Sequence, residues 1–269
     1  AKKMKIDFIS TPFDYESLNF LYSLRVPFFK IPSGEINNLP FLWKIANLKK
    51  NVILSTGMSN LSDIELALAV LNHGFSSRTQ PKDLDEVWAL WSKLDINKFR
   101  KKVSILHCLS NYPAKDNEVN LNAIKTLKKA FKIPVGFSDH SLGIHLPIAA
   151  ITLGAVIIEK HLTLDKNLEG PDHSSSLEPL ELKKLVQNIR SLENALGDGI
   201  KKTQKNEWEV RGKVRKKIVA SRKIKKGEKF SSKNLKIIRS ETGLYPENYW
   251  NLLGTISDKN YSENDSIDK

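Results

Sequence analysis

Residues 134–165 read PVGFSDHSLGIHLPIAAITLGAVIIEKHLTLD, and this stretch decides the fold. Two short apolar runs, 134–138 and 155–160, are separated by a segment whose apolar residues have helical spacing. The first run is followed by His140 and the second by His161. A strand, a helix and a second strand in this order predict a βαβ unit with parallel strands.

The same alternation of apolar runs and helical segments continues through the preceding residues. Near-continuous apolar strands separated by helices predict a parallel sheet covered by helices. Polar residues follow every strand, which favours a (β/α) barrel, whereas a doubly wound sheet would collect its chemistry at one switch point. A standard barrel has about eight strands, so we expect an α/β fold of the TIM type, (β/α)8, that lacks its first two βα units in this chain. The six predicted strands are 5–10, 26–31, 51–55, 103–108, 134–138 and 155–160.

The barrel pattern ends near Gly197 and Gly199, which suit the end of a helix. We expect the barrel to occupy residues 1–199 and a charged linker to occupy 200–211. The remaining residues, 212–269, contain short strand-like runs and predict a small, mainly β domain.

The connection at 72–102 is longer than an ordinary barrel connection. It contains Trp88 and Trp91, which are three residues apart and would share one face of a helix. This pattern indicates either an extra helix packed on the barrel or a partner surface.

The composition indicates a basic globular protein of 269 residues with 40% hydrophobic residues and a formal net charge of +13. The charge could attract anionic small molecules, bind nucleic acid, or simply form a solvated face. No nucleic-acid motif accompanies it, so we expect no nucleic acid. No apolar stretch approaches the ~20 residues of a membrane span. The one cysteine, Cys108, cannot form an internal disulfide, which fits a cytoplasmic protein; it could be a buried residue or a nucleophile.

His140 and His161 end neighbouring predicted strands, and parallel strands lie ~4.8 Å apart. Two imidazoles with oxygen ligands suit Mn²⁺, Fe²⁺, Co²⁺ or Zn²⁺ better than Mg²⁺ or Ca²⁺. The alternative is a capping turn at 139–140 and a core histidine at 161.

The other strand ends carry hydroxyls and a lysine. A phosphate group needs several donors and a cation, because its charge is too concentrated to bury unpaired. Serines at strand ends are also common turn residues, so both interpretations stay open. The residues are Ser10, Thr11, Lys30, Ser33, Ser55, Thr56 and Ser138.

Glu35 and Asp172 lie in glycine-containing loops just after strands. Either carboxylate could be a general acid or base, and either could be a helix cap or an ion-pair partner.

Together these motifs resemble the N-acetylneuraminate (sialic acid) synthase family, from residue 8 to about residue 267. The last stretch, IVASRKIKKGEKFSSKNLKIIRSETGL, is similar to the antifreeze-like (SAF) domain of that family. The GPDH loop with SGEI and SLEP is more similar to the sialic and legionaminic branch than to the pseudaminic branch. The other matching strings are STPFD, FKIPSGEINNLP, ILSTGMSNLSDIE, LHCLSNYPAKDNEVNLNAI, VGFSDHSLGIHLPIAAITLGA, IEKHLTLDKNLEGPDHSSSLEP and ALGDGIKK.

The resemblance implies a transferase that condenses phosphoenolpyruvate with an N-acetylmannosamine-like or 2,4-diacetamido-trideoxyhexose sugar, giving a nonulosonic acid and phosphate. By position, His140 and His161 would bind a divalent metal, with Mn²⁺ first and Mg²⁺ or Co²⁺ as alternatives. Glu35 would be the third catalytic residue, beside the reacting carbons.

The resemblance also implies the substrate contacts. Phosphoenolpyruvate would be held by Thr11, Lys30, Ser33, Ser55 and Ser138. The sugar site would contain Tyr112, Asp172 and Ser110, and Ser110 stands where family members commonly have asparagine, serine or threonine. Arg239 matches the arginine that the SAF domain inserts into the active site of the partner subunit, which implies a domain-swapped homodimer.

Two other functions stay open on the sequence alone. A related 3-deoxy sugar-acid synthase would need a second phosphate site, for which the sequence offers no obvious arginine cluster. A non-catalytic protein could instead bind a polyanion through its basic C-terminal domain. The chain could also be an inactive fragment that retains the site residues.

Overall fold

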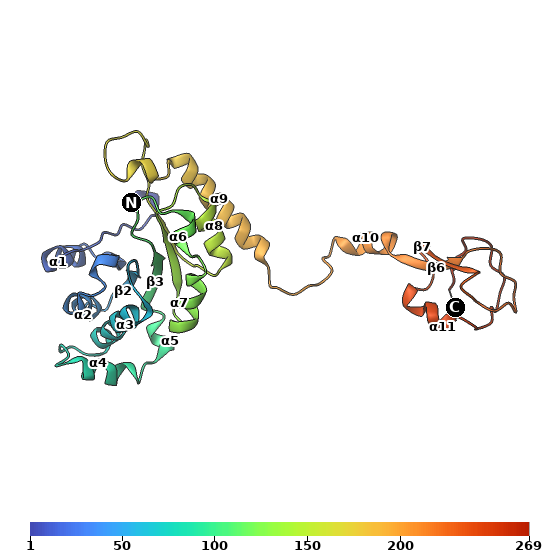
Figure 1. Cartoon of the computed structure of the whole chain (residues 1–269), viewed down its shortest axis with the longest axis horizontal. Helices are drawn as coiled ribbons and strands as arrows, with labels where there is room; N and C mark the ends of the chain where they lie inside the picture. Colours follow the sequence, from blue (N-terminus) through green and yellow to red (C-terminus); the bar gives the residue numbers. More distant parts are fainter. Residues whose placement is uncertain (269) are drawn as a thin grey trace. The chain divides into compact units, whose positions relative to one another are not determined.

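The computed structural model describes residues 1–268, and the chain divides into two compact units, residues 1–197 and 198–269. Figure 1 shows both units, with most of their helices and strands labelled as below. None of the helices in residues 1–268 is long and apolar enough to cross a membrane.

The first unit is built on one sheet of five parallel strands. Consecutive strands of the chain are neighbours throughout, in the order β1-β2-β3-β4-β5. A doubly wound sheet reverses its strand order at a switch point, whereas a barrel does not. The order therefore confirms the barrel-type α/β architecture, and the described residues form five strands of it. The strands are β1 (Phe28–Ile31), β2 (Asn51–Ser55), β3 (Val103–Cys108), β4 (Val135–Asp139) and β5 (Ile158–Lys160).

The prediction of a first strand at residues 5–10 is wrong. The structure has no strand there, and Ile6 and Phe8 are exposed. Within residues 1–268 no strand pairs with β1 on the side away from β2. The alternating pattern of this segment is typical of a strand, but a strand forms only where its backbone groups find a ladder and its apolar side chains find a core.

Helices follow the strands and cover one face of the sheet. α3 begins with a capping box in which the side chain of Asn60 accepts from the backbone of Asp63, while the side chain of Asp63 accepts from the backbone of Asn60. The helices of this unit are α1 (Tyr15–Ser23), α2 (Leu39–Asn47), α3 (Leu61–Ser76), α4 (Leu84–Trp91), α5 (Ile96–Phe99), α6 (Asp116–Val119), α7 (Ala123–Phe131), α8 (His145–Thr152) and α9 (Pro179–Leu196), with 3-10 turns at Lys2–Met4, Ser33–Glu35 and His173–Ser175.

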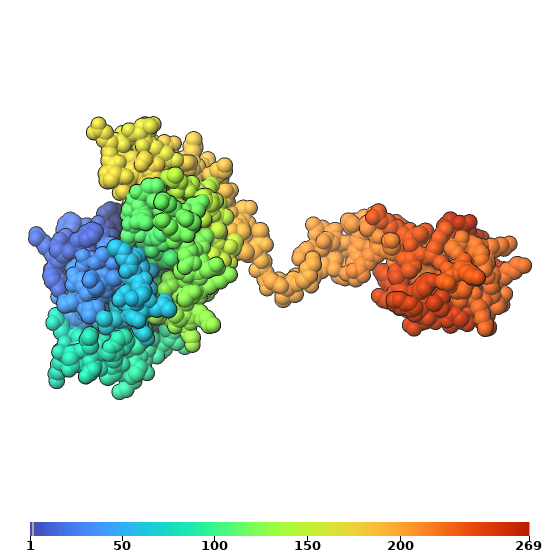
Figure 2. Space-filling view, in the orientation of Figure 1, coloured from blue at the N-terminus to red at the C-terminus, as the bar shows by residue number. Residues whose placement is uncertain are grey.

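The insertion at 72–102 forms α4 and α5, which pack on the outside of the sheet's helices. Val87 is fully buried, and Trp91 donates from its indole Nε1 to Glu65 Oε1 of α3 at 3.2 Å. Trp91 also meets Phe99 edge to face, with the ring centroids 5.8 Å apart. These contacts confirm an extra helix packed on the barrel. In Figure 2 the insertion (teal) covers one end of the first unit.

The second unit has its own small core around the antiparallel pair β6 (Lys216–Ala220) and β7 (Leu235–Arg239). Ile218, Phe230 and Tyr261 are buried in it. Residues 200–211 were expected to be a linker, but α10 (Glu207–Val214) begins inside this range. Acidic residues in its first turn and basic residues in its last turn complement the helix dipole. A 3-10 turn at Pro246–Asn248 and α11 (Tyr249–Leu252) complete the unit.

Candidate active site

The two faces of the sheet differ in chemistry because successive residues of a strand point to opposite faces. One face is apolar and packs against the helices, with side chains such as Phe29, Val52, Ile105 and Phe137 almost fully buried. The other face carries polar side chains near the carboxyl ends of the strands. The strand pairing places five polar side chains on this face: Lys30, Ser55, Cys108, Ser138 and Glu159.

The polar face is concave. Lys30 on β1 lies 3.4 Å from Glu159 on β5, measured between Nζ and Oε2. In a flat sheet, strands four positions apart would be separated by about 19 Å. The sheet therefore curls so that its first and last strands meet through these two side chains. Ser138 donates from Oγ to the other carboxylate oxygen of Glu159 at 2.6 Å.

The loops after β1, β2 and β3 converge beside this cluster. The hydroxyl of Ser33 accepts from the backbone N–H of Gly57 at 2.9 Å. A Cβ atom on Gly57 would lie 2.5 Å from Ser110 Oγ and 2.8 Å from Ser33 Oγ, so a larger residue at position 57 would force these hydroxyls to move. Ser55 is buried, and its Oγ has no hydrogen-bond partner within the described residues. An unpartnered buried hydroxyl is costly, and a bound ligand could satisfy it.

The two predicted histidines lie side by side at the ends of β4 and β5. The imidazole centroids of His140 and His161 are 5.3 Å apart. The ring of Tyr112 stacks on His140 with a centroid distance of 4.1 Å and lies 5.4 Å from the centroid of His161. Asp172 Oδ2 is 3.6 Å from Nδ1 of His161. Four of the predicted site residues are therefore in one group.

The polar contacts of the two histidines fit a divalent metal. Nδ1 of His140 contacts the carbonyl oxygen of Leu109, and Nδ1 of His161 faces the carboxylate of Asp172. Metal-binding histidines commonly use one ring nitrogen in this way, which leaves the other nitrogen for the ion. In the described part of the chain, no three His, Cys, Asp or Glu side chains are arranged to hold a metal. The remaining ligands would therefore be water or substrate oxygens.

Burial sets the protonation of the groups around the histidines. It lowers the pKa of His140, chiefly by desolvation, against the opposing contact with Leu109. The imidazole is therefore neutral over a wider pH range, as a metal ligand must be. Burial also raises the pKa values of Cys108 and Tyr112. Cys108 is thus held as a buried thiol, which disfavours its interpretation as a nucleophile.

Glu35, Thr11 and Arg239, which the resemblance also implies, make no hydrogen bond or ion pair with this cluster among the described residues. The carboxylate of Glu35 accepts from the side-chain amide of Asn38 at 2.7 Å. Thr11 is half-buried in the segment before α1 and has no side-chain hydrogen bond to the cluster within residues 1–268. Arg239 is an exposed residue at the end of β7 in the second unit.

The sequence places Glu159 among the strand-end carboxylates that could be a general acid or base, but we gave it no site role, although it contacts both Lys30 and Ser138. A signal was available, because Glu159 and His161 are two residues apart and so face the same side of β5. Lys160, between them, faces the other side and forms a buried ion pair with Asp139 at 2.6 Å. Gly57 was missed as well, since only the converging loops reveal its role.

Known proteins share this architecture. The model of the NeuB family matches residues 1–201. The chain belongs to the NeuB family. Over 267 residues it is 50% identical to the N,N'-diacetyllegionaminic acid synthase of Campylobacter jejuni, which covers 99% of this chain and 73% of that protein.

Another NeuB relative is the N,N'-diacetyllegionaminic acid synthase of Legionella pneumophila, which is 41% identical, with coverage of 97% of this chain and 68% of that protein. Among solved structures, the N-acetylneuraminic acid synthetase of Leptospira borgpetersenii in complex with citrate superposes with a TM-score of 0.64. It is 37% identical and covers 78% of this chain and 65% of that chain. NeuB membership confirms the resemblance inferred from the sequence motifs.

Proposed function

We propose that this NeuB-family chain is a nonulosonic acid synthase that condenses phosphoenolpyruvate with a 2,4-diacetamido-trideoxyhexose or N-acetylmannosamine-like sugar. The observation that carries the proposal is the geometry of the concave face, where two imidazoles 5.3 Å apart share one face of the sheet with Lys30. The 50% identity to a legionaminic acid synthase favours the diacetamido sugar as substrate.

The reaction forms one carbon–carbon bond and breaks one carbon–oxygen bond. The methylene carbon of phosphoenolpyruvate attacks the aldehyde carbon of the open-chain sugar, and the aldehyde oxygen takes up a proton. Water adds to the carbon that bears the phosphate, and cleavage of the bond from that carbon to oxygen releases inorganic phosphate. A divalent metal, with Mn²⁺ the first candidate, would polarise the aldehyde and orient the water.

The residues of the chain would hold the two substrates around this metal. Lys30 and the hydroxyls of Ser33, Ser55 and Ser138 would bind the phosphate of phosphoenolpyruvate. Glu159 holds Lys30 in place before substrate arrives, because its carboxylate lies 3.4 Å from the ammonium. The phosphate of phosphoenolpyruvate would then compete with Glu159 for the ammonium group of Lys30.

The sugar would lie on the side of the histidines. Tyr112 stacks on His140 and keeps its phenol proton because burial raises its pKa, so it can donate to a sugar hydroxyl. Asp172 is half-buried, and its carboxylate would accept a hydrogen bond from another sugar hydroxyl. The same carboxylate would orient the ring of His161. Glu35, in the loop after β1, is the proposed proton-handling group, and Thr11 and Ser110 are proposed at the edge of the site.

Metal binding tests the central part of this proposal. We expect the purified chain to bind Mn²⁺, measured by electron paramagnetic resonance of the free ion, and His161→Ala to weaken that binding by at least about tenfold. His145→Ala is the matched control, because His145 is an exposed histidine that pairs with Asp116 at 3.3 Å, outside the cluster. With Mn²⁺ and both substrates, wild type should release phosphate together with a nonulosonic acid. Equal Mn²⁺ binding by the two variants would overturn the assigned metal site.

A further inference from the structure

A second cleft lies at the opposite end of the sheet from the candidate active site. Lys49 comes two residues before β2, and Lys102 comes directly before β3, so both mark the amino ends of these strands. The catalytic cluster lies at the carboxyl ends, about 17–20 Å away along strands of this length. A molecule in this cleft would therefore not be a substrate bound at the active site. We call this second cleft the lysine cleft.

The lysine cleft is strongly basic. Asp95 is the only acidic residue among its described lining residues, and it is already engaged as the N-cap of α5 and as a partner of Lys98 at 3.4 Å. Lys49 donates to the carbonyl oxygens of Gly74 and Phe75 at the end of α3. The other lysines have no carboxylate partner within residues 1–268. Five lysines line the cleft: Lys49, Lys93, Lys98, Lys101 and Lys102.

The floor of the lysine cleft is apolar and partly aromatic. Phe75 and Phe99 meet edge to face with centroids 6.3 Å apart, and Leu90 and Leu94 line the cleft beside them. The volume is about 530 Å³. This lies within the range of sites that enclose a small molecule, about 300–1,000 Å³. The cleft thus combines concentrated positive charge with a surface for an apolar or flat group.

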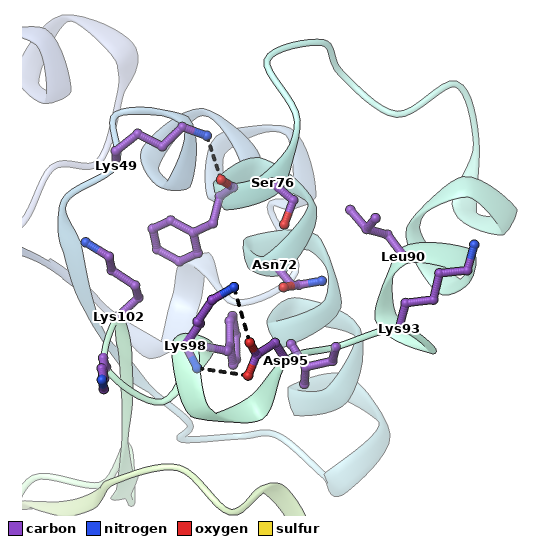
Figure 3. Close-up of a pocket in the computed structure, with 12 residues that line it drawn as sticks. Lys49, Asn72, Ser76, Leu90, Lys93, Asp95, Lys98 and Lys102 are labelled. Carbon is purple, nitrogen blue, oxygen red and sulfur yellow. Dashed lines mark hydrogen bonds and ion pairs between the residues drawn. The ribbon is translucent and has the colours of Figure 1, made fainter.

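Asn72 supplies the observation that points to a ligand. Its exposed fraction is 8%, it lines the cleft, and its carboxamide has no hydrogen-bond partner within the described residues. Figure 3 shows this carboxamide directed from α3 into the space toward Leu90 and Lys93. Asn47 on the neighbouring helix α2 is different, because its amide donates to the carbonyl oxygen of Ser77 at 2.8 Å. The amide nitrogen and oxygen of Asn72 are therefore open to the cleft, and a ligand there could hydrogen-bond to them.

We propose that the lysine cleft binds a small molecule in which a phosphate group is attached to an aromatic body, as in a nucleotide. Figure 3 shows Lys93 and Lys102 on opposite sides of the cleft, so the phosphate would be bound by one of them, and the aromatic body would lie on the Phe75–Leu94 floor. The amide of Asn72 would hydrogen-bond to a polar atom of the ring. The inserted helices α4 and α5 provide Leu90 and Phe99, so the insertion creates this site.

Direct titration with three probes tests both halves of the proposed ligand. Calorimetry of the whole chain should show binding of adenosine 5'-monophosphate, with adenosine and inorganic phosphate each at least about tenfold weaker. Binding should weaken as salt is raised, because the charges are partly exposed. Adenosine binding as tightly as the monophosphate would overturn the role of the lysines, and equal binding of inorganic phosphate would overturn the role of the floor.

Variants locate the binding. The pair Lys93→Gln and Lys102→Gln should weaken the monophosphate at least about tenfold. The matched control, Lys125→Gln with Lys129→Gln on α7, removes the same charge from exposed lysines outside the cleft and should have little effect. Asn72→Leu should weaken binding while the protein stays folded, since leucine suits a helix interior. Equal weakening by the two lysine pairs would show a diffuse charge effect and overturn the site.

One more variant separates this site from the proposed active site. Lys30→Ala removes the cation proposed to bind phosphoenolpyruvate, and it should leave the affinity for adenosine 5'-monophosphate unchanged. Loss of that affinity in Lys30→Ala would place the nucleotide in the active site and overturn the inference. The readout is binding alone, so its failure and a failure of the proposed synthase reaction are distinguishable.

Discussion

At the scale of single residues, the site depends on which way each side chain of β4 and β5 points. Ser138 and Glu159 are register partners on the concave face, and Asp139 and Lys160 are register partners on the helix-covered face. In the first pair Glu159 lies 3.4 Å from Lys30, whereas the second pair is a buried ion pair at 2.6 Å. Alternating residues of one strand thus serve the chemistry and the scaffold.

His140 gives a prediction about pH. Burial lowers its pKa in the folded state, while the unfolded chain has a histidine pKa of about 6.5. Below that pH the unfolded state binds more protons, so stability falls as the pH falls from neutral toward the folded-state pKa. We expect the thermal midpoint, measured by calorimetry between pH 7.5 and 5.5, to drop less in His140→Gln than in wild type.

Two other histidines must be considered in interpreting that measurement. His107 is also buried with a lowered pKa, chiefly from desolvation, so part of the pH dependence should survive in His140→Gln. His145→Gln, at an exposed position, serves as the control and should follow the wild-type profile. A His140→Gln variant with the full wild-type pH dependence would contradict the prediction.

At the scale of elements, the five strands from β1 to β5 were predictable, because each is a short apolar run bounded by polar residues. The run at 5–10 has the same pattern but no strand, since local pattern does not reveal whether a ladder partner is present. In the site, the histidine pair and Lys30 were predictable from strand ends. The contact of Lys30 with Glu159 was not, because it depends on the curvature of the whole sheet.

The turn after β2 gives a second prediction. Gly57→Ala should cost about 1–3 kcal/mol of stability, because its Cβ would meet the hydroxyls of Ser110 and Ser33. It should also weaken phosphoenolpyruvate binding, measured by calorimetry, since Ser33 is a proposed phosphate ligand. Gly34→Ala is the control, because a Cβ there has no neighbour within 4 Å. The prediction fails if both variants unfold at the wild-type midpoint.

At the scale of the whole molecule, each of the two units has a core of its own. The resemblance implies that Arg239, which belongs to the second unit, contributes to a sugar site built on the first. If Arg239 completes the site of another copy, as the resemblance implies, then the active assembly is a dimer in which each site combines residues from two chains.

Mixing two inactive variants tests this assembly. His161→Ala and Arg239→Ala should each lose most activity alone. In a mixed dimer, one site would combine the intact His161 of one chain with the intact Arg239 of the other, so co-refolded variants should regain up to about a quarter of wild-type phosphate release per chain. If Arg239 served its own chain, every site would lack one residue and the mixture would stay inactive. A mixture of His145→Ala with Arg239→Ala is the control, because it dilutes Arg239→Ala with an equal amount of a chain that keeps both His161 and Arg239.

The alternating side-chain directions along β4 and β5 limit which insertions and deletions this protein can accept during evolution. Inserting or deleting a single residue within 135–139 or 158–160 would turn every following side chain to the opposite face. After such a change in 135–139, Asp139 would enter the reaction space, and His140 would be pushed among the helices. Length variation is therefore tolerable in the loops that follow these strands, while the strands themselves can accept substitutions only.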